Sequence, residues 1–404
     1  MDKTLVIFVL TYIVMALGQP PLFRVDRAGA AIIGAGLIII TGSISETKAY
    51  MSIDYKTLII LFGMMIVVAN LRLSGFFSLV ISFIIKYFKE PLVLLKWLII
   101  VSAILSAFFI NDTVCLIFTP FILHVTDYMK INPKPYLIAL CMASNIGSVA
   151  TLTGNPQNII IGNASGISYF KFFIKMLPVA GIGIIILYHI LKIFYHKDLV
   201  IEKKEIPHIR VRYNKALVRK SLFVSIVLII LYMVGLPMEI VALGAGCFLL
   251  ITRRIKPEKV YALIDFRLLV LFTGLFILIG SLESSQLSKE MLHYIGNLST
   301  KNLWLLTLIS CILSNMVSNV PAVMLYKPML TMTGAGELSW LTLAMSSTLA
   351  GNLTILGSIA NIIVIESASP RVKICFWEYS RIGIIVTTLS IIAGMVVISL
   401  FANT

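Results

Sequence analysis

The chain has 404 residues, of which 59% are hydrophobic and only 13% charged, and its mean hydropathy is +0.99. So little polar surface excludes a soluble globule and predicts an all-α polytopic protein of the lipid bilayer, placed in the cell (inner) membrane. The net charge of +15 comes from basic residues in short connectors between apolar runs, as is typical of cytoplasmic loops, so no nucleic-acid partner is expected.

The first part of the chain, residues 1–195, contains five apolar runs that predict spanning helices. The earliest run is expected to stay as a helix rather than act as a signal peptide, because no small-residue cleavage site follows it. Runs shorter than about 20 residues can still span if the bilayer thins or the flanks extend them. The predicted spans are 4–18, 28–43, 57–71, 136–162 and 172–194.

Between the third and fourth of these spans the pattern is less regular. Residues 74–89 are mixed in character and are predicted to lie along the membrane interface. Two apolar runs, 92–109 and 114–129, then flank a polar break. Two apolar runs separated by a polar break within so short a stretch predict a re-entrant hairpin over 92–129. Such a hairpin enters and leaves the membrane on the same side.

Residues 196–220 form the longest polar stretch. Eight lysines or arginines stand there against three acids, so this segment is predicted to be a cytoplasmic linker between two halves of the chain.

The second half, 221–404, repeats the first. Ile53-Asp54-Tyr55-Lys56 returns as Ile264-Asp265-Phe266-Arg267, and further matches follow in the same order, which indicates a duplicated membrane domain. A second interfacial segment over 286–299 and a second hairpin over 303–332 are therefore expected. The predicted spans are 221–235, 237–252, 267–282, 339–366 and 382–402.

Five crossings and one hairpin per half predict two inverted repeats. If the linker is cytoplasmic, both termini lie outside, and 25 of the 33 basic residues fall on the cytoplasmic side. Six crossings per half would instead make the repeats parallel.

The two hairpin breaks carry polar residues at corresponding places: Asn111, Asp112 and Thr113 in the first, and Ser318 and Asn319 in the second. A helix that begins at such a break directs free amide hydrogens and its positive dipole end at the gap, which favours an anion. Carbonyl and amide oxygens of the break can hold Na⁺. The alternative is that these residues only cap the hairpin helices.

Two long spans, 136–162 and 339–366, are interrupted by similar residues and are predicted to be broken helices. Glycine, asparagine and proline unwind an apolar helix at mid-membrane, and carbonyls freed there can bind ions. A simple kink is the alternative, although a kink requires only the proline. The polar positions are Thr151, Gly154, Asn155 and Asn158, with Thr354, Gly357, Ser358 and Asn361 as their counterparts.

Asp112 is the most distinctive single residue, because a carboxylate at mid-membrane is costly and such groups carry protons, bind ions or pair with a cation. Its counterpart is Val320, so symmetry does not require an acid. A role as cation ligand or proton carrier is favoured, with helix capping as the alternative.

At these breaks the sequence resembles a known group. The tips look like the Ser-Asn-Thr signature pairs of divalent anion/sodium symporters, although the first reads Asn-Asp-Thr and the second has Val320 and Pro321 where a hydroxyl is usual. The string Ala143–Ser148 leading to Gly154-Asn155-Pro156-Gln157-Asn158 is similar to the arsenite permease and sodium/proton antiporter-like branch of the ion transporter superfamily, with its citrate-transporter-like domain.

The resemblance covers nearly the whole chain and implies ten or eleven spans, two opposed hairpins, a homodimer and an elevator motion. It also implies two symmetric Na⁺ pockets. One pocket would use Ser106, Asn111 and carbonyls near Gly154, and the other Ser314, Asn319 and carbonyls near Gly357.

These observations favour a secondary active transporter of a small anion, a carboxylate or inorganic oxyanion, coupled to Na⁺ or H⁺. The chain has no His-Glu-x-x-His motif and no phosphate-binding loop, so no enzyme and no cofactor is expected, and no metal beyond Na⁺. A cation/proton antiporter and an arsenite or antimonite efflux permease remain as alternatives, and a separate ATPase subunit stays open.

The predicted site residues fall into two sets. The substrate-binding set is Asn111, Thr113, Asn155, Asn158, Ser318, Asn319, Ser358 and Asn361. The coupling-ion set is Ser106, Asp112, Thr151, Gly154, Ser314, Thr354 and Gly357.

Overall fold

The computed structural model of the chain describes residues 3–17, 25–88, 90–199, 213–285, 290, 302–369 and 371–401. The described part is α-helical, as predicted, apart from one 3₁₀ turn. Six of its helices are long and apolar enough to cross a membrane, and shorter apolar helices accompany them. An all-α polytopic membrane protein is therefore confirmed.

The first half runs from α1 to α11. Its helices are α1 (Lys3–Leu17), α2 (Arg27–Ile40), α3 (Glu46–Met51), α4 (Tyr55–Ser74), α5 (Phe76–Tyr87), α6 (Pro91–Phe108), α7 (Asn111–Met129), α8 (Lys134–Ser148), α9 (Pro156–Ser165), α10 (Tyr169–Phe194) and α11 (His196–Leu199).

The second half has the same order of elements. They are α12 (Lys215–Val234), α13 (Met238–Leu250), α14 (Pro257–Tyr261), α15 (Phe266–Ser284), α17 (Leu303–Val317), α18 (Asn319–Met332), α19 (Glu337–Ala350), η1 (Ile355–Gly357), α20 (Ile359–Ala368) and α21 (Phe376–Leu400).

The duplicated Ile-Asp motif has a local structural role. Asp54 caps α4 by accepting a hydrogen bond from the Thr57 amide at 3.2 Å, and Asp265 caps α15 by accepting one from Leu268 at 3.1 Å. A side-chain oxygen at this position satisfies a backbone donor that the helix cannot. The repeat therefore marks where the third long helix of each half begins.

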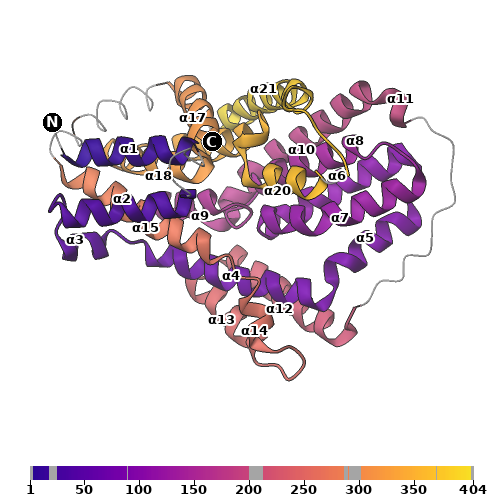
Figure 1. Cartoon of the computed structure of the whole chain (residues 1–404), viewed down its shortest axis with the longest axis horizontal. Helices are drawn as coiled ribbons and strands as arrows, with labels where there is room; N and C mark the ends of the chain where they lie inside the picture. Colours follow the sequence, from indigo (N-terminus) through magenta and orange to yellow (C-terminus); the bar gives the residue numbers. More distant parts are fainter. Residues whose placement is uncertain are drawn as a thin grey trace.

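Helices from the two halves pack in exchanged pairs. Helix α2 lies on α15, and α13 lies on α4, so that each pair joins corresponding elements of opposite halves. The crossings are close, since a Cβ added at Gly63 would lie 2.5 Å from the Ala242 carbonyl oxygen and one at Gly274 would lie 2.7 Å from the Ala31 carbonyl carbon. Only glycine permits such an approach. We call α1, α2, α4, α12, α13 and α15 the support helices (Figure 1).

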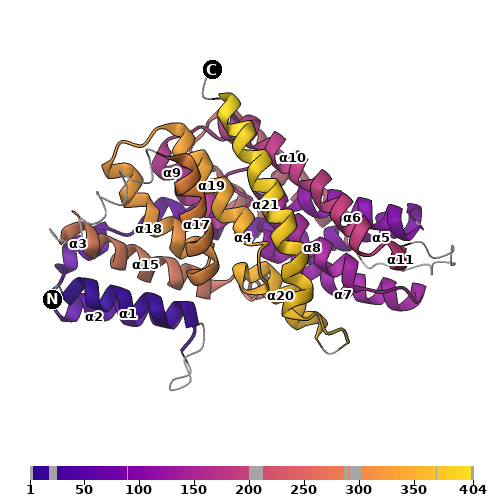
Figure 2. The ribbon, with the colours of Figure 1, turned by 90° about the horizontal axis from the view of Figure 1, so that it is seen from above.

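The other long helices form a second group, the hairpin bundle, which consists of α6–α10 and α17–α21. Here too the pairs are exchanged, because α20 packs on α7 and α18 packs on α9. Helices α10 and α21 cross at the middle of the bundle, as Figure 2 shows. Such exchange is what a two-fold relation between the halves would produce. Opposite insertion in the membrane stays a prediction.

Both predicted hairpins are helix–break–helix units, hairpin 1 (α6 and α7) and hairpin 2 (α17 and α18). The two spans predicted to be broken helices, 136–162 and 339–366, are each two helices, α8 with α9 and α19 with α20, separated by an unwound polar stretch. Helix α12 begins inside the expected linker, at Lys215, where the Asn214 side chain caps it. Most of the linker, and residues 286–299 apart from Glu290, lie outside the described residues.

Candidate functional site

The tip of hairpin 1 is held by an asparagine. Only Phe109 and Ile110 separate α6 from α7, and Asn111 begins α7 with a buried side chain. Its Oδ1 accepts a hydrogen bond from the Asp112 amide at 3.0 Å, and its Nδ2 donates to Asn145 Oδ1 at 3.1 Å. One amide thus closes the start of α7 and ties the tip to α8.

The tip of hairpin 2 is tighter. Ser318 alone joins α17 to α18, and its φ of 80° lies in the left-handed region that residues with a Cβ avoid. With its amide oriented to suit its neighbours, Asn319 donates to the carbonyl oxygens of Ser347 at 3.0 Å and Gly357 at 3.2 Å. The second tip therefore binds the break that follows α19.

Each broken span is stabilised by one asparagine that holds two carbonyls. Asn158 Nδ2 donates to the carbonyl oxygens of Ser148 and Thr151, both at 3.0 Å. Asn361 Nδ2 donates in the same way to Gly351 at 2.7 Å and Thr354 at 3.1 Å. Both asparagines are fully buried. They satisfy carbonyls that the unwinding has freed, which an apolar side chain could not do.

Threonines link each break to the hairpin of its own half. The Thr151 hydroxyl donates to the Ala107 carbonyl of α6, and the Gly154 amide donates to that hydroxyl at 3.0 Å. The Thr354 hydroxyl lies 3.1 Å from Asn315 Oδ1 on α17. Hairpin and break in each half are thus hydrogen-bonded to each other.

The two breaks are also bonded to each other. Asn145 on α8 donates to Asn352 Oδ1 at 2.9 Å and to Asn361 Oδ1 at 3.2 Å, and it accepts from Ser358 at 3.1 Å. From the other half, Thr348 donates to Asn158 Oδ1 at 3.5 Å. Asn145 and Thr348 are corresponding positions, so the cross-links follow the repeat. We call this set of bonded groups the polar centre.

Glycines let the backbone close around the polar centre. A Cβ at Gly154 would lie 2.7 Å from the Ser148 carbonyl oxygen and 2.9 Å from that of Ser106. At Gly357 it would lie 2.8 Å from Asn315 Oδ1 and 3.0 Å from the Gly351 carbonyl oxygen. In both halves the unwound turn presses against the hairpin without room for a methyl group.

Several buried hydroxyls have no hydrogen-bond partner among the described residues, and two of them occupy corresponding positions on the two hairpins. Ser106 and Ser314 are corresponding, fully buried residues, and neither hydroxyl has a hydrogen-bond partner among the described residues. A buried unpaired hydroxyl is unfavourable, so a native orphan calls for an explanation such as a bound ion. Each lies on its hairpin about one turn before the tip, and hydroxyl, amide and carbonyl oxygens together suit Na⁺.

Not all predicted residues join the polar centre. Asn155 reaches only the Ser148 hydroxyl, at 3.3 Å. Asp112 and Thr113 instead line a separate cavity of about 140 Å³ beside the tip of hairpin 1, together with Arg72 and Asp265. The acid that the sequence analysis singled out therefore faces the support helices.

Several residues of the polar centre were missed by sequence reasoning: Asn145, Gln157, Asn315, Thr348 and Asn352. A buried amide in an otherwise apolar helix is the signal that could have found Asn145 and Asn315.

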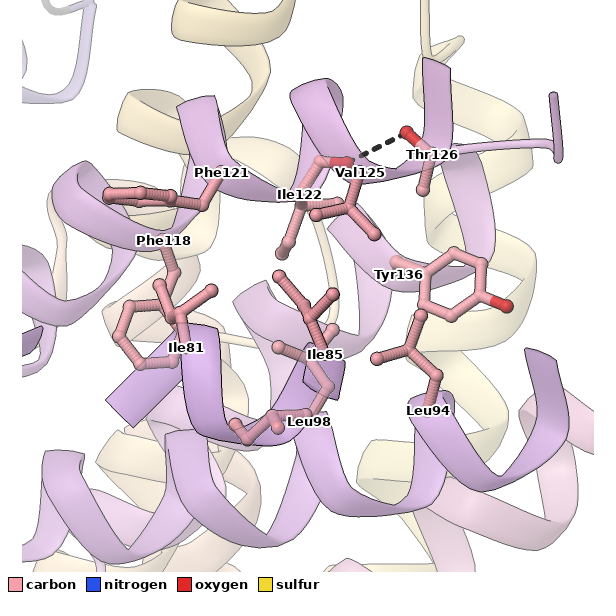
Figure 3. Close-up of a pocket in the computed structure, with 11 residues that line it drawn as sticks. Ile81, Ile85, Leu94, Leu98, Phe118, Phe121, Ile122, Val125, Thr126 and Tyr136 are labelled. Carbon is pink, nitrogen blue, oxygen red and sulfur yellow. Dashed lines mark hydrogen bonds between the residues drawn. The ribbon is translucent and has the colours of Figure 1, made fainter. Parts of the chain in front are cut away.

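A further pocket lies between α5, α6, α7 and α8 (Figure 3). Its volume is about 30 Å³, and aliphatic and aromatic side chains such as Ile81, Leu98 and Phe118 line it. The polar atoms at its edge are satisfied internally, since Thr126 donates to the Ile122 carbonyl at 2.8 Å and Tyr136 to that of Pro91 at 2.9 Å. An ion would lose its hydration there without compensation, so this is a packing space.

Comparison with known proteins shows the family of the chain. A family model described as a citrate transporter matches residues 10–350. The chain belongs to the citrate transporter family. Proteins with similar sequences include a 46 kDa membrane protein of Mycobacterium leprae, 29% identical over 96% of each chain. Another is a silicon efflux transporter of Oryza sativa subsp. japonica, 29% identical over 90% of each chain. A putative transporter arsB of Dictyostelium discoideum is 24% identical over 94% of this chain and 88% of its own.

Membership of the citrate transporter family and the apolar helices establish a multi-pass membrane transporter. The relatives from Oryza sativa and Dictyostelium discoideum are named as transporters, so a transport protein rather than an enzyme is supported.

Proposed function

We propose that the protein is a secondary active transporter of a small anion, a carboxylate or inorganic oxyanion, driven by Na⁺ or H⁺. The observation that carries this proposal is the polar centre. Two corresponding hairpin tips and two corresponding breaks converge in buried amides, hydroxyls and backbone carbonyls, without a fixed charge of their own. Neutral groups of this kind can replace the hydration of an ion and release it again.

In this proposal the helix starts at Asn111 and Asn319 attract the anion, with Asn155, Asn158, Ser318, Ser358 and Asn361 around it, while Thr113 lines the separate cavity beside Asp112. The unpaired hydroxyls of Ser106 and Ser314, with Thr151, Gly154, Thr354 and Gly357, provide two corresponding positions for the coupling cation. Asp112 carries the cation or proton that sets direction. Movement of the hairpin bundle against the support helices, as in an elevator, would expose the site first to one side and then to the other.

We further propose that the protein acts in the cell (inner) membrane as a homodimer, with residues 196–220 in the cytoplasm and both termini outside. The basic composition of that stretch supports its cytoplasmic placement.

The test is uptake of labelled small anions into proteoliposomes, with and without a Na⁺ gradient and with and without a pH gradient. We expect one anion to accumulate only when a gradient is present, and Asp112→Asn to lose the dependence on the cation. Asp127→Asn is the matched control, because it removes an exposed carboxylate from the other end of α7. Full ion dependence in Asp112→Asn would contradict the role of Asp112.

A second candidate is efflux of arsenite or antimonite, which the names of the arsB and silicon efflux relatives favour. It predicts metalloid resistance in a sensitive host that expresses the chain. A cation/proton antiporter, in contrast, would dissipate a pH gradient in proteoliposomes on addition of Na⁺ alone.

A further inference from the structure

The hairpin bundle touches the support helices unequally on its two sides. On the hairpin 2 side, Lys327 Nζ on α18 lies 4.0 Å from Asp54 Oδ2 at the start of α4. The Tyr12 hydroxyl of α1 donates to the Pro321 carbonyl at 3.0 Å, and Asn163 of α9 donates to Thr57 at 2.9 Å. Helix α4 packs on α9, and α15 packs on α18. This side is closed.

The hairpin 1 side is open. The corresponding pairs, α15 with α20 and α4 with α7, have no comparable packing in the described part of the chain. The cavity of about 140 Å³ lies there instead, with walls from α4, α7, α15 and α20. Helix starts and ends meet at this cavity, so charged groups from both the support helices and the hairpin bundle face it.

Arg72 of α4 and Asp112 of α7 face this cavity, and neither makes an ion pair within 4.0 Å with any residue that the structure describes. Asp265, the other acid of the cavity, is exposed and caps α15 through Leu268. Opposite charges in a low-dielectric setting attract strongly, and a carboxylate there is stable only with a cation or a proton. Arg72 is therefore the internal partner available to Asp112.

Ion pairs and hydrogen bonds join the two halves of the chain within the hairpin bundle, so hairpin 1 and hairpin 2 should move together. Lys134 Nζ lies 2.8 Å from Glu378 Oε2, and Lys175 Nζ lies 3.0 Å from Glu337 Oε1. Each pair joins the start of a broken span in one half to the last long helix of the other. The bonds of Asn145 connect the breaks between them. Closing the gap at hairpin 1 would then draw hairpin 2 away from α1 and α4.

From this geometry we infer that Arg72 competes with the coupling cation for Asp112, and that an Arg72–Asp112 pair alternates with the Lys327–Asp54 pair during transport. With the cation bound, Asp112 is neutralised and hairpin 1 stays apart from α4. Once the cation leaves, the guanidinium pairs with the carboxylate and closes the cavity, while Lys327 separates from Asp54. The inference rests on the proposed coupling role of Asp112. It adds Arg72 as the group that binds Asp112 when no cation is bound there.

Disulfide cross-linking in membranes tests the inference without knowledge of the substrate. Ala69→Cys and Leu116→Cys place one thiol on α4 and one on α7, at cavity positions about one helical turn from the charged pair. The exposed Cys247 and Cys375 are first replaced by serine. The full-length chain is oxidised in Na⁺-free membranes, and the cross-linked fraction is measured.

We expect Asp54→Asn to raise the cross-linked fraction at least threefold, because it removes the pair that holds the other side closed. Adding Arg72→Gln or Asp112→Asn should return the fraction to its starting value, whereas Arg72→Lys should keep it raised. Exchange of the charges, Arg72→Asp with Asp112→Arg, should restore it, which a purely structural role for either residue would not predict. Asp265→Asn is the control in the same cavity and should leave the fraction unchanged, since asparagine also caps a helix.

The inference would be overturned if adding Arg72→Gln to Asp54→Asn left the cross-linked fraction unchanged. It would also be overturned if the charge exchange failed to restore the raised fraction in folded protein. The proposed function fails differently. If Asp112→Asn lowers cross-linking but keeps full ion dependence of transport, the ion pair stands and the coupling role of Asp112 is wrong.

Discussion

Hairpin 1 and hairpin 2 are alike where they face each other and different where they face the support helices. Inward, both tips end in an asparagine that bonds to the polar centre, and both hairpins carry an unpaired buried serine. Outward, hairpin 2 is bound to α1 and α4 through Pro321 and Lys327, whereas hairpin 1 borders a cavity. The comparison teaches that duplication preserved the groups of the polar centre, while the contacts with the support helices diverged.

The largest effect is expected from the two asparagines that hold the breaks. Asn158→Ala leaves the carbonyls of Ser148 and Thr151 without their donor, at a cost of about 1–3 kcal/mol for each orphaned group. Asn361→Ala leaves the Gly351 carbonyl without its donor, whereas the half-buried Thr354 carbonyl still accepts from the Gly357 amide at 3.2 Å. Thermal unfolding of the purified protein should show large losses for both variants, with the larger loss in Asn158→Ala. Asn155→Ala, which removes only one long hydrogen bond, should lose much less. A mild Asn361→Ala beside a severe Asn158→Ala would break the equivalence of the halves.

Adding a methyl group at the unwound turns comes next. Gly154→Ala and Gly357→Ala force a Cβ against carbonyl or amide oxygens less than 3 Å away, and overpacking of this kind costs about 1–3 kcal/mol. We expect reduced thermal stability together with loss of transport. Gly36→Ala and Gly244→Ala are the controls, because a Cβ there meets nothing within 4 Å. Wild-type transport by Gly154→Ala would show that the turn is not part of the site.

The ion pairs at the ends of the bundle should contribute less. Burial alone would raise the pKa of Glu337, but hydrogen bonds from Lys171 and Lys175 lower the pKa below its ordinary value. Because the folded-state pKa is depressed, the stabilisation is present above the unfolded pKa of 4.5 and is lost as the pH falls through the lower, folded-state value. Glu337→Gln should flatten that acid limb of the stability profile and cost about 1 kcal/mol or less at neutral pH. An unchanged profile would show that the pair does not form.

The smallest change in stability is expected at the unpaired hydroxyls. Ser106→Ala and Ser314→Ala remove groups that bond to nothing in the described structure, so the free energy of unfolding should change by about 0.5 kcal/mol or less. Transport should nevertheless need several-fold more coupling cation for half-maximal rate, equally in both variants. An unchanged cation requirement in both would remove these serines from the proposed ion positions.

Much of this could be predicted from the sequence because it depends on local order. The repeat of Ile53–Lys56 at Ile264–Arg267 gave the duplication, and the structure shows why these residues recur, since both aspartates cap a helix. The hairpins followed from apolar runs on either side of Asn111 and Asn319. The position of Asp112 within the fold did not follow, because a helix start can face the polar centre or the support helices, and only packing decides between them.

The sequence by itself determined that the chain lies in a lipid bilayer and that it is duplicated. It also determined the positions of the four breaks and the residue types found there, because hydropathy and chain-breaking residues act over a few neighbouring residues. Only the tertiary structure decided that Asn145 joins the two breaks, that Ser106 and Ser314 are left unpaired, and that Arg72 shares a cavity with Asp112. These contacts join groups that lie far apart in the chain. They depend on how whole helices cross, which no local pattern encodes.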